Sequence, residues 1–425
     1  MGRQTGAHGG SADHALRRQA VALAALALVA AALAIAGACL VRAVTSDGER
    51  TGATEALVAS HAPLAQGARL TEPTATRVTL SAVGDHLMNM PVVYAADANA
   101  GEMGDGLYDF MPMYAGLADV LATHDLNFID IETILGGDSL GLSGYPVFNS
   151  PAAIAGQVSA AGWNLATTAT NHAWDQGMEG IANSSATWAA YPGVTVTGTF
   201  TSPEDRARVR VREVGGVRVA FLAYTDYLNG YELPDEYGYA IATTDDWQVV
   251  ADDVARARAQ ADVVIVAMSW GDENSTTPND FQRAFAQYLA DQDADLVLGF
   301  GPHVIQPVET LDARDEAGSP TGHRTLVAYS LGNFLSNQPE AIENVEGCLT
   351  CTFVVTPGRV RIEGVTWTPL VNHIDGDYHA VFRLRDYPDE LAYAHDSIGV
   401  TDSPTTYARD VTEEVIGPCG VSIDM

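Results

Sequence analysis

Residues 78–86 read Val-Thr-Leu-Ser-Ala-Val-Gly-Asp-His, an apolar run that ends in a glycine and two polar side chains. A short apolar run bounded by a turn residue predicts a buried strand over Val78–Val83. The same pattern returns along the chain. The further predicted strands are Leu126–Ile131, Leu165–Ala169, Val194–Val196, Val217–Tyr224, Val263–Met268, Leu296–Leu298 and Leu326–Tyr329. Most of these runs are continuous and aliphatic, which indicates a sheet that is covered on both faces.

Amphipathic stretches separate these strands, and aspartates near several of their starts suit the N-terminal end of a helix. The predicted helices are Met111–Ala122, Ala152–Ala161, Met178–Ala190, Trp247–Gln260 and Phe281–Gln292. Alternating strands and helices predict an α/β layered fold, which we place at residues 77–370. A hairpin is expected at Thr352–Val355 and Val360–Trp367. Residues 371–425 are polar and show no clear pattern, so we expect a C-terminal extension there.

Polar side chains follow six of the predicted strands at the point where each strand ends. They lie in Gly84-Asp85-His86, Asp130-Ile131-Glu132, Asn171-His172, Ser269-Trp270-Gly271-Asp272-Glu273, Gly301-Pro302-His303 and Ser330-Leu331-Gly332-Asn333. Each segment alone is typical of an ordinary turn or helix cap. Because ligands of α/β sheets bind at the carboxyl ends of strands, the ordered set predicts one shared site. Carboxylate, amide and imidazole groups on converging loops suit a divalent cation and a hydrolase that uses it.

The same segments resemble the CapA-like capsule synthesis family of poly-γ-glutamate biosynthesis, which is related to calcineurin-like metallophosphoesterases. The resemblance covers about residues 77–337. It rests on the ordered motifs AVGD (82–85), LNFIDIE (126–132), ATNHAWDQG (169–177), SWGDE (269–273), GFGPHVIQP (299–307) and YSLGNF (329–334). It implies a four-layer αββα sandwich of the metallophosphoesterase type and a membrane-anchored role in making or exporting an anionic surface polymer.

The resemblance also implies roles for individual residues. A divalent metal ion (Mn, Zn or Mg) is expected at Asp85, Glu132, Asn171 and His303. His172 is the expected general acid, and Asp175 is the second catalytic residue. The other residues expected to line the site are His86, Ser269, Trp270, Glu273 and Asn333.

Two positions depart from the family pattern. Ser269 and Gly301 stand where the family usually carries histidine. Serine is a weak neutral ligand and glycine offers no side chain, which argues against a full two-metal centre. His86, beside Asp85, is the candidate substitute ligand. Whether the chain is an enzyme therefore stays open between a metal-dependent hydrolase with a reduced site and a fold that has lost catalysis.

All 22 basic residues are arginine, against 54 acidic residues, and the formal net charge is −32. The absence of lysine excludes P-loop kinase and pyridoxal phosphate chemistry, and the acidic balance argues against nucleic-acid binding. Arg206, Arg208, Arg210 and Arg212 alternate, so on a strand they would share one face. That face is either a docking surface for an anionic polymer or a solvated face paired with nearby acids.

Residues 20–41 form an uncharged run that is long enough to cross a bilayer core. The arginines before it predict a cytoplasmic N-terminus at 1–19, a membrane anchor at 20–41 and a flexible linker at 42–76. Cleavage near Ala38 and lipidation at Cys39 are the alternatives. Each alternative places the domain on the extracytoplasmic side of the cell membrane. Cysteines 348, 351 and 419 fit that oxidising compartment, and a disulfide among them is expected, with its pairing open.

Three functions therefore remain to be separated. The favoured one is synthesis or export of an anionic capsule polymer such as poly-γ-glutamate, with the membrane and the polymer or its biosynthetic complex as partners. The second is an extracytoplasmic metal-dependent phosphoesterase that acts on a small substrate. The third is a polymer-binding module that kept the fold and lost catalysis.

Overall fold

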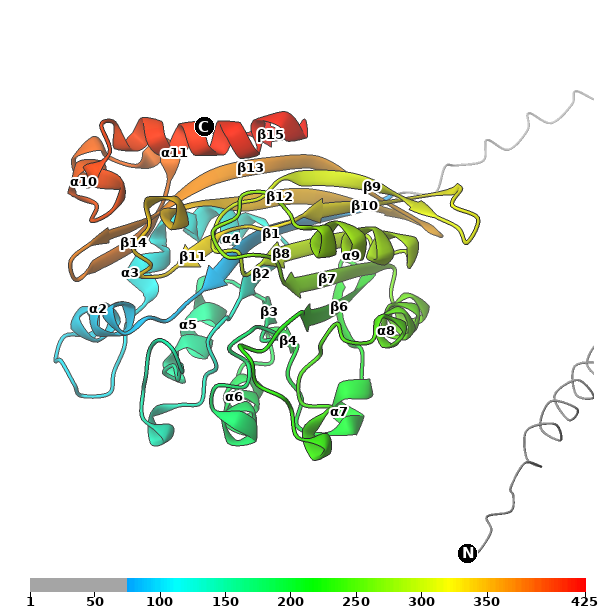
Figure 1. The fold of residues 1–425 in the computed structure, drawn as a ribbon, viewed down its shortest axis with the longest axis horizontal. Helices are drawn as coiled ribbons and strands as arrows, with labels where there is room; N and C mark the ends of the chain where they lie inside the picture. The colour runs from blue at the N-terminus through cyan, green and yellow to red at the C-terminus, as the bar shows by residue number, and fades with distance from the viewer. Residues whose placement is uncertain (1–74) are drawn as a thin grey trace, which may run out of the picture. The chain divides into compact units, whose positions relative to one another are not determined.

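The structure, a computed structural model, describes residues 75–425, whose strands form two sheets (Figure 1). The predicted segments 1–19 and 20–41 and nearly all of the linker 42–76 lie outside the described residues. Among residues 75–425, no helix combines the length and the apolar character needed to cross a membrane.

The first sheet has nine strands, ordered β14-β13-β12-β1-β2-β3-β4, with β11 paired to β1 and β15 to β13. The strands are β1 (Thr76–His86), β2 (Leu126–Asp130), β3 (Leu165–Thr167), β4 (Thr195–Thr197), β11 (Asn333–Leu335), β12 (Val345–Thr356), β13 (Arg359–Asp375), β14 (Tyr378–Arg383) and β15 (Ser422–Ile423). Strands β1 to β4 are parallel, and β12 is antiparallel to both β1 and β13. The parallel strands bring their carboxyl ends to one edge of this sheet.

The second sheet has six strands in the order β5-β6-β7-β8-β10-β9. The strands are β5 (Arg210–Val214), β6 (Val217–Thr225), β7 (Val263–Ser269), β8 (Leu296–Phe300), β9 (Val308–Arg314) and β10 (Pro320–Ala328). The four inner strands are parallel, whereas the edge strands β5 and β9 are antiparallel to their neighbours. All eight strands predicted before Leu331 are present, and the α/β prediction is confirmed as a mixed α/β fold.

The apolar core shows how the layers stack. One cluster lies between the sheets, where Leu80 and Phe128 of the first meet Phe221 and Leu298 of the second. A second cluster joins the outer face of the first sheet to helices α2, α3, α4 and α5, and a third joins the second sheet to α8 and α9. The helices are α2 (Met90–Ala100), α3 (Met111–Tyr114), α4 (Ala118–Thr123), α5 (Ala153–Ala161), α6 (Gly177–Ala189), α7 (Pro203–Ala207), α8 (Trp247–Gln260), α9 (Asp280–Asp291), α10 (Asp389–Ala394) and α11 (Pro404–Val415).

The predicted helix Met111–Ala122 is broken into α3, a 3₁₀ turn at Ala115–Leu117 and α4. The break lies where the chain passes close to β14, because a Cβ on Gly116 would be 2.2 Å from the Val381 carbonyl oxygen. Helix periodicity in the sequence does not report this tertiary contact.

The C-terminal residues are part of the same sheet, so the predicted boundary at residue 370 falls inside β13. Residues 371–425 contribute β14, α10, α11 and β15, and β15 pairs with β13. Leu384, Ile398 and Ala408 of this region pack in one buried cluster with Val345 of β12. The predicted hairpin is confirmed as β12–β13, with its turn at Pro357-Gly358.

The four alternating arginines do not form a stripe on one strand. Arg206 lies in α7 and Arg208 follows it, while Arg210 and Arg212 lie on β5. Their partners are Asp253 for Arg206 at 2.6 Å, Asp205 for Arg208 and Arg210 at 3.0 and 2.8 Å, and the Gly193 carbonyl for Arg212 at 2.8 Å. The structure therefore favours local pairing over a docking surface here.

The prediction of a disulfide among the three cysteines is wrong, since Cys348, Cys351 and Cys419 are free thiols. Cys348 packs in the cluster outside the first sheet and Cys351 in the cluster between the sheets. These two side chains lie on opposite faces of β12 and cannot reach each other. Burial raises the pKa of both thiols to about 12.

We expect Gly84→Ala to destabilise the fold, because a Cβ there would be 1.8 Å from the Gly332 carbonyl oxygen, which accepts a hydrogen bond from the Asp85 N–H at 3.0 Å. Overpacking of this kind costs roughly 1–3 kcal/mol of unfolding free energy or more. Gly193→Ala is the control, since a Cβ there meets no atom within 4 Å. Chemical denaturation measures both, and equal midpoints for the two variants would contradict the expectation.

Candidate metal centre

Asp85 lies at the carboxyl end of β1 and is fully buried. The Gly301 N–H lies 3.2 Å from both of its carboxylate oxygens, and His303 Nδ1 lies 3.1 Å from Oδ2. Gly301 and His303 follow β8, so these hydrogen bonds join the two sheets at their carboxyl ends. Gly301 has a φ of +101° and His303 a φ of +62°. A left-handed histidine is strained, and such strain concentrates at functional sites.

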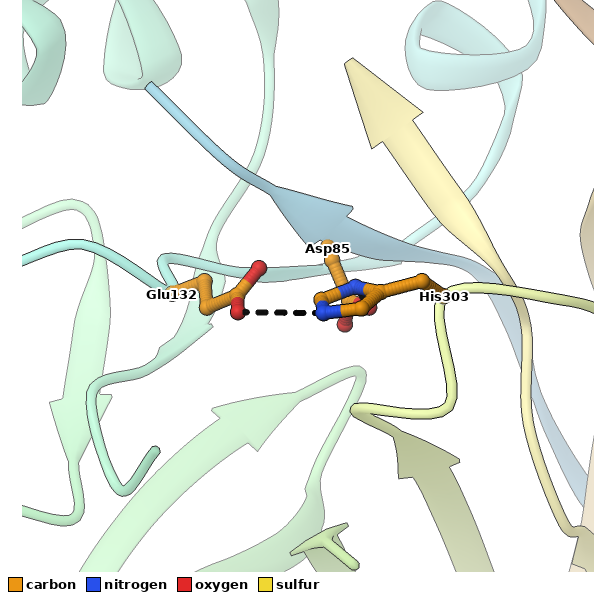
Figure 2. Close-up of side chains that lie close together, drawn as sticks. All are labelled: Asp85, Glu132 and His303. Atoms are coloured by element: carbon orange, nitrogen blue, oxygen red, sulfur yellow. Dashed lines mark hydrogen bonds and ion pairs between the residues drawn. The ribbon is translucent and has the colours of Figure 1, made fainter. Parts of the chain in front are cut away.

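The hydrogen-bond partners of His303 define its tautomer. Its Nδ1 also lies 3.0 Å from Asn333 Oδ1. The Asn333 amide nitrogen donates to Gln338 and to the Glu343 carbonyl, which fixes the oxygen toward the imidazole. Both neighbours of Nδ1 are therefore acceptors, and Nδ1 carries a proton. The opposite nitrogen, Nε2, faces Glu132 Oε1 at 3.8 Å (Figure 2).

Glu132 lies two residues beyond β2 and is buried. Neither of its carboxylate oxygens has a hydrogen-bond partner among residues 75–425. Burial raises its pKa to about 7, with a further contribution from the charge of Asp85, although His303 and His172 act in the opposite direction. A buried carboxylate without donors is costly, and a cation would relieve that cost.

Asp130, at the end of β2, adds a further buried carboxyl group beside Asp85. Both of its oxygens also lack a partner within the described part of the chain. Burial, Asp85 and Glu132 all raise its pKa well above the ordinary value. Burial alone would lower the pKa of His303, but Glu132 and Asp85 raise it to about 10. The His303 imidazole therefore faces two buried acids, Asp85 and Glu132, and Asp130 adds a third buried carboxyl group next to them.

Asp85, Glu132 and His303 together fit one divalent cation. Each offers one ligand atom, and these atoms lie within 4.8 Å of one another. Figure 2 shows the side chains of Glu132, Asp85 and His303 converging, with the Glu132 carboxylate directed toward the imidazole ring. Two carboxylate oxygens and one imidazole nitrogen are ligands that Mn²⁺ and Zn²⁺ accept. The unpartnered oxygens of Glu132 are the observation that supports this fit.

Asn171 and His172 lie in the loop after β3, at the same edge. His172 Nδ1 lies 2.7 Å from Asp175 Oδ2, which also accepts from the Phe148 N–H at 2.7 Å. The Phe148 ring stands edge-on to the imidazole, with 4.6 Å between ring centroids. Asp175 and Phe148 therefore hold the orientation of His172, while the charge of His172 acts on Glu132. Asn171 Oδ1 is buried and has no partner among the described residues.

The two positions that depart from the family pattern are neighbours in space. A Cβ added to Gly301 would lie 3.5 Å from Ser269 Oγ, and this hydroxyl is buried without a partner in residues 75–425. Glu273 is exposed, and its charge raises the pKa values of both Glu132 and His303. The structure therefore brings Asp85, Glu132, His303, Asn333, Asn171, His172, Asp175, Ser269 and Glu273 to one end of the sheets.

Two predicted site residues lie elsewhere. His86 Nε2 lies 2.8 Å from the Tyr114 hydroxyl, in the layer outside the first sheet, and burial lowers its pKa to about 3. It follows Asp85 on β1, and successive strand residues point to opposite faces, so it is no substitute ligand. Trp270 is fully buried between β7 and the outer helices, where Nε1 donates to the Tyr329 carbonyl at 2.8 Å. The Trp270 side chain is therefore part of the apolar core and does not line the site.

The loop after β6 also belongs to the site, although it was not predicted from the sequence. Asn229 has a φ of +50°, and its side chain lies 3.3 Å from Asn171 Nδ2 and 3.3 Å from both ring nitrogens of His172. Asp226 accepts from the Gly271 N–H at 3.4 Å, and burial raises its pKa to about 7. The signal was present, because Asp226 follows a predicted strand as Asp85 does.

We expect Asn333→Ala to weaken manganese binding by about 10- to 100-fold, because it removes the partner that orients His303. Asn344→Ala is the control. Asn344 is equally buried in the same segment, and its amide donates to the Gln338 and Glu340 carbonyls without touching His303. Calorimetric titration with Mn²⁺ measures both. Equal affinity in the two variants would show that Asn333 has no part in positioning the imidazole.

Comparison with curated proteins finds two relatives with related names. The chain is 28% identical over 176 residues to "PGA biosynthesis protein CapA" of Bacillus subtilis (strain 168), which covers 41% of this chain and 43% of that protein. It is 27% identical over 186 residues to "Capsule biosynthesis protein CapA" of Bacillus anthracis, covering 43% and 42%. The alignments thus span less than half of either relative.

Among solved structures, the NAD nucleotidase NadN of Haemophilus influenzae matches with a TM-score of 0.43 and 13% identity, over 80% of this chain and 67% of that one. A putative 5′-nucleotidase of Staphylococcus aureus matches with a TM-score of 0.39 and 13% identity, over 80% and 58%.

A family model gives the broadest match in sequence. The model described as "Bacterial capsule synthesis protein PGA_cap" matches residues 79–338. That range is more than half of the chain and contains all six motifs and every residue of the metal centre. The resemblance predicted from the motifs is confirmed, and the chain belongs to the bacterial capsule synthesis protein family PGA_cap.

Proposed function

We propose that this protein acts in the synthesis or export of an anionic capsule polymer such as poly-γ-glutamate, through a hydrolase site that uses one divalent metal ion. The observation that carries the proposal is the buried set of Asp85, Glu132 and His303, whose ligand atoms lie within 4.8 Å of one another. Membership of the capsule synthesis family supports the polymer class, and the paired sheets between helical layers are in keeping with a metallophosphoesterase-type sandwich.

Asp85, Glu132 and His303 would hold the cation, with Asn171 beside them as an oxygen donor. A divalent cation bound there supplies positive charge toward a substrate oxygen. His303 can serve as a neutral ligand through Nε2, since Asp85 and Asn333 retain its other proton at Nδ1.

His172 is positioned to move a proton. Asp175 Oδ2 accepts from Nδ1–H at 2.7 Å, so the proton to be transferred would leave from Nε2, which lies 3.3 Å from the Asn229 amide nitrogen. Asp175 is buried and receives a second hydrogen bond from the Phe148 N–H, so its orientation is defined before any substrate binds. In this arrangement His172 delivers a proton to the leaving oxygen, and Asp175 stabilises the protonated ring.

Membrane anchoring is the second part of the proposal. We propose that residues 20–41 hold the protein to the cell membrane and that residues 75–425 lie on its extracytoplasmic side. The uncharged run in the sequence supports this placement. A polymer that leaves the cell would meet the metal centre on that side.

A non-catalytic polymer-binding module is the second candidate function. Ser269 and Gly301 favour it, because neither replaces the imidazole that the family usually carries at its position. Metal stoichiometry separates the candidates. One equivalent supports the reduced hydrolase site, two equivalents support a full phosphoesterase centre, and none supports the binding module.

We expect the chelator-treated full-length chain to bind one equivalent of Mn²⁺. Glu132→Gln should weaken that binding by about tenfold or more, since it replaces a charged ligand by a neutral amide. Asp312→Asn is the matched control, because its carboxylate is 67% exposed on β9. Elemental analysis and calorimetry measure both variants, and zero equivalents in the unaltered chain would overturn the hydrolase proposal.

We expect His172→Asn to reduce the surface polyanion of a complemented deletion strain to the level of the deletion itself, because the proton donor is lost. His124→Asn is the control, since this imidazole follows α4 in the outer layer and, within residues 75–425, bonds only to its own helix and to the neighbouring Thr123. Quantifying the cell-surface polymer tests the pair. A normal polymer level with His172→Asn and with Asp175→Asn would contradict a catalytic role.

A further inference from the structure

A groove of about 1130 Å³ lies at the end of the sheets opposite the metal centre. The tip of the β12–β13 hairpin and residues 321–324 of β10 border it, and the hairpins β9–β10 and β12–β13 extend to the same side of the molecule (right in Figure 1). Asp295, just before β8, lines this groove, whereas Gly301, just after β8, contacts Asp85. The strand between them separates the two places by about 20 Å.

Arginines gather in this groove, although the chain carries 54 acidic residues against 22 basic ones. The lining includes five arginines and three aspartates, and we call it the arginine groove. Its charged residues are Arg218, Arg258, Arg324, Arg359 and Arg361 with Asp262, Asp293 and Asp295. The excess of acidic residues in the whole chain repels polyanions at long range. The groove is therefore where a polyanion would find cationic partners.

Arg258 has a structural role, since it pairs with the buried Asp295 at 2.5 Å, and it is not available to a ligand. The other arginines are held loosely. Arg218 lies 3.6 Å from Asp262, and its side chain is 52% exposed, while Arg324 lies 3.3 Å from Asp312 and is 66% exposed. Ion pairs this exposed contribute little to stability because water screens them. A ligand carboxylate can replace such a partner at small cost.

Two more arginines lie at the tip of the β12–β13 hairpin. Arg361 is 53% exposed and contacts Glu363. Arg359 is exposed, and no acidic group within residues 75–425 pairs with it. Guanidinium groups on opposing hairpins would meet successive charges of one extended chain, and each is suited to a carboxylate.

The other lining residues are of mixed kind, with aliphatic side chains beside His323 and four threonines, Thr76, Thr310, Thr321 and Thr356. Val217, Leu326, Val355, Ile362 and Val365 contribute to the groove, and the lining holds no phenylalanine, tyrosine or tryptophan. Single-stranded nucleic acids bind through bases stacked on aromatic rings, so the lining disfavours them. Aliphatic side chains between guanidinium groups suit carboxylates that are carried on methylene spacers.

We propose that the arginine groove binds an extended polymer chain that bears carboxylates on aliphatic spacers, at a site separate from the metal centre. This inference rests on the proposed function for the identity of the polymer. The groove would hold a polymer segment while the metal centre, at the other end of the sheets, acts independently of it. The groove also provides a cationic surface. The arginines at α7 and β5 do not provide one, because Arg206, Arg208 and Arg210 pair with aspartates.

Binding of poly-γ-glutamate to the full-length chain in detergent tests the groove, with calorimetry as the readout. We expect Arg324→Gln/Arg359→Gln to weaken the binding by about tenfold or more. Arg208→Gln/Arg409→Gln, which removes the same charge from exposed positions elsewhere, should bind as the unaltered chain does. Equal losses in the two double variants would overturn the inference, because they would indicate an effect of net charge alone.

Two further arms separate this inference from the proposed function. Arg324→Gln/Arg359→Gln should still bind one equivalent of Mn²⁺ as the unaltered chain does, since the metal centre lies at the other end of β8. Polyadenylate, a phosphate polyanion, should bind at least tenfold more weakly than poly-γ-glutamate. Equal affinity for polyadenylate, or no binding of poly-γ-glutamate at all, would overturn the groove proposal. The manganese titration would still decide the metal site.

Discussion

The carboxylate of Asp85 joins the two sheets at the edge where the chemistry lies. It belongs to β1 of the first sheet, and its hydrogen bonds come from Gly301 and His303, which follow β8 of the second sheet. Two glycines make this possible. Gly84 lets β1 pass against the Gly332 carbonyl, and Gly301 adopts a φ of +101° that other residues rarely take. A histidine at 301, as in the family pattern, would need another loop conformation.

Burying Asp85 at this point creates a deficit of positive charge. Asp130, at the end of β2, pairs in register with Asp85, and Glu132 lies two residues further along. The carboxylate oxygens of both residues have no hydrogen-bond partner within residues 75–425. The chain has no lysine to balance them, and among residues 75–425 the basic side chain in contact with Asp85 is His303. A divalent cation meets this need with the same residues that the family motifs place in order. The electrostatic deficit therefore links the fold to the proposed function.

The sequence predicted what depends on local pattern and strand order. Asp85, Glu132 and His303 could be predicted to lie close together because each follows a buried strand, and parallel strands end at one edge. His86 was misplaced because its neighbour in sequence points to the opposite face of β1. Trp270 was misplaced because its role is to pack β7 against the outer helices, which no motif reports. Asn229 was missed because it lies in a loop that contains none of the six motifs. Its side chain reaches His172 through a left-handed backbone conformation at residue 229.

The central claim is that Asp85, Glu132 and His303 share one metal ion. Anomalous diffraction at the manganese edge, from crystals of the protein grown with Mn²⁺, tests it directly. The account predicts a single anomalous peak within bonding distance of a carboxylate oxygen of Asp85, a carboxylate oxygen of Glu132 and Nε2 of His303. No peak at these three residues, or a second peak of equal height beside Ser269 and Gly301, would contradict it.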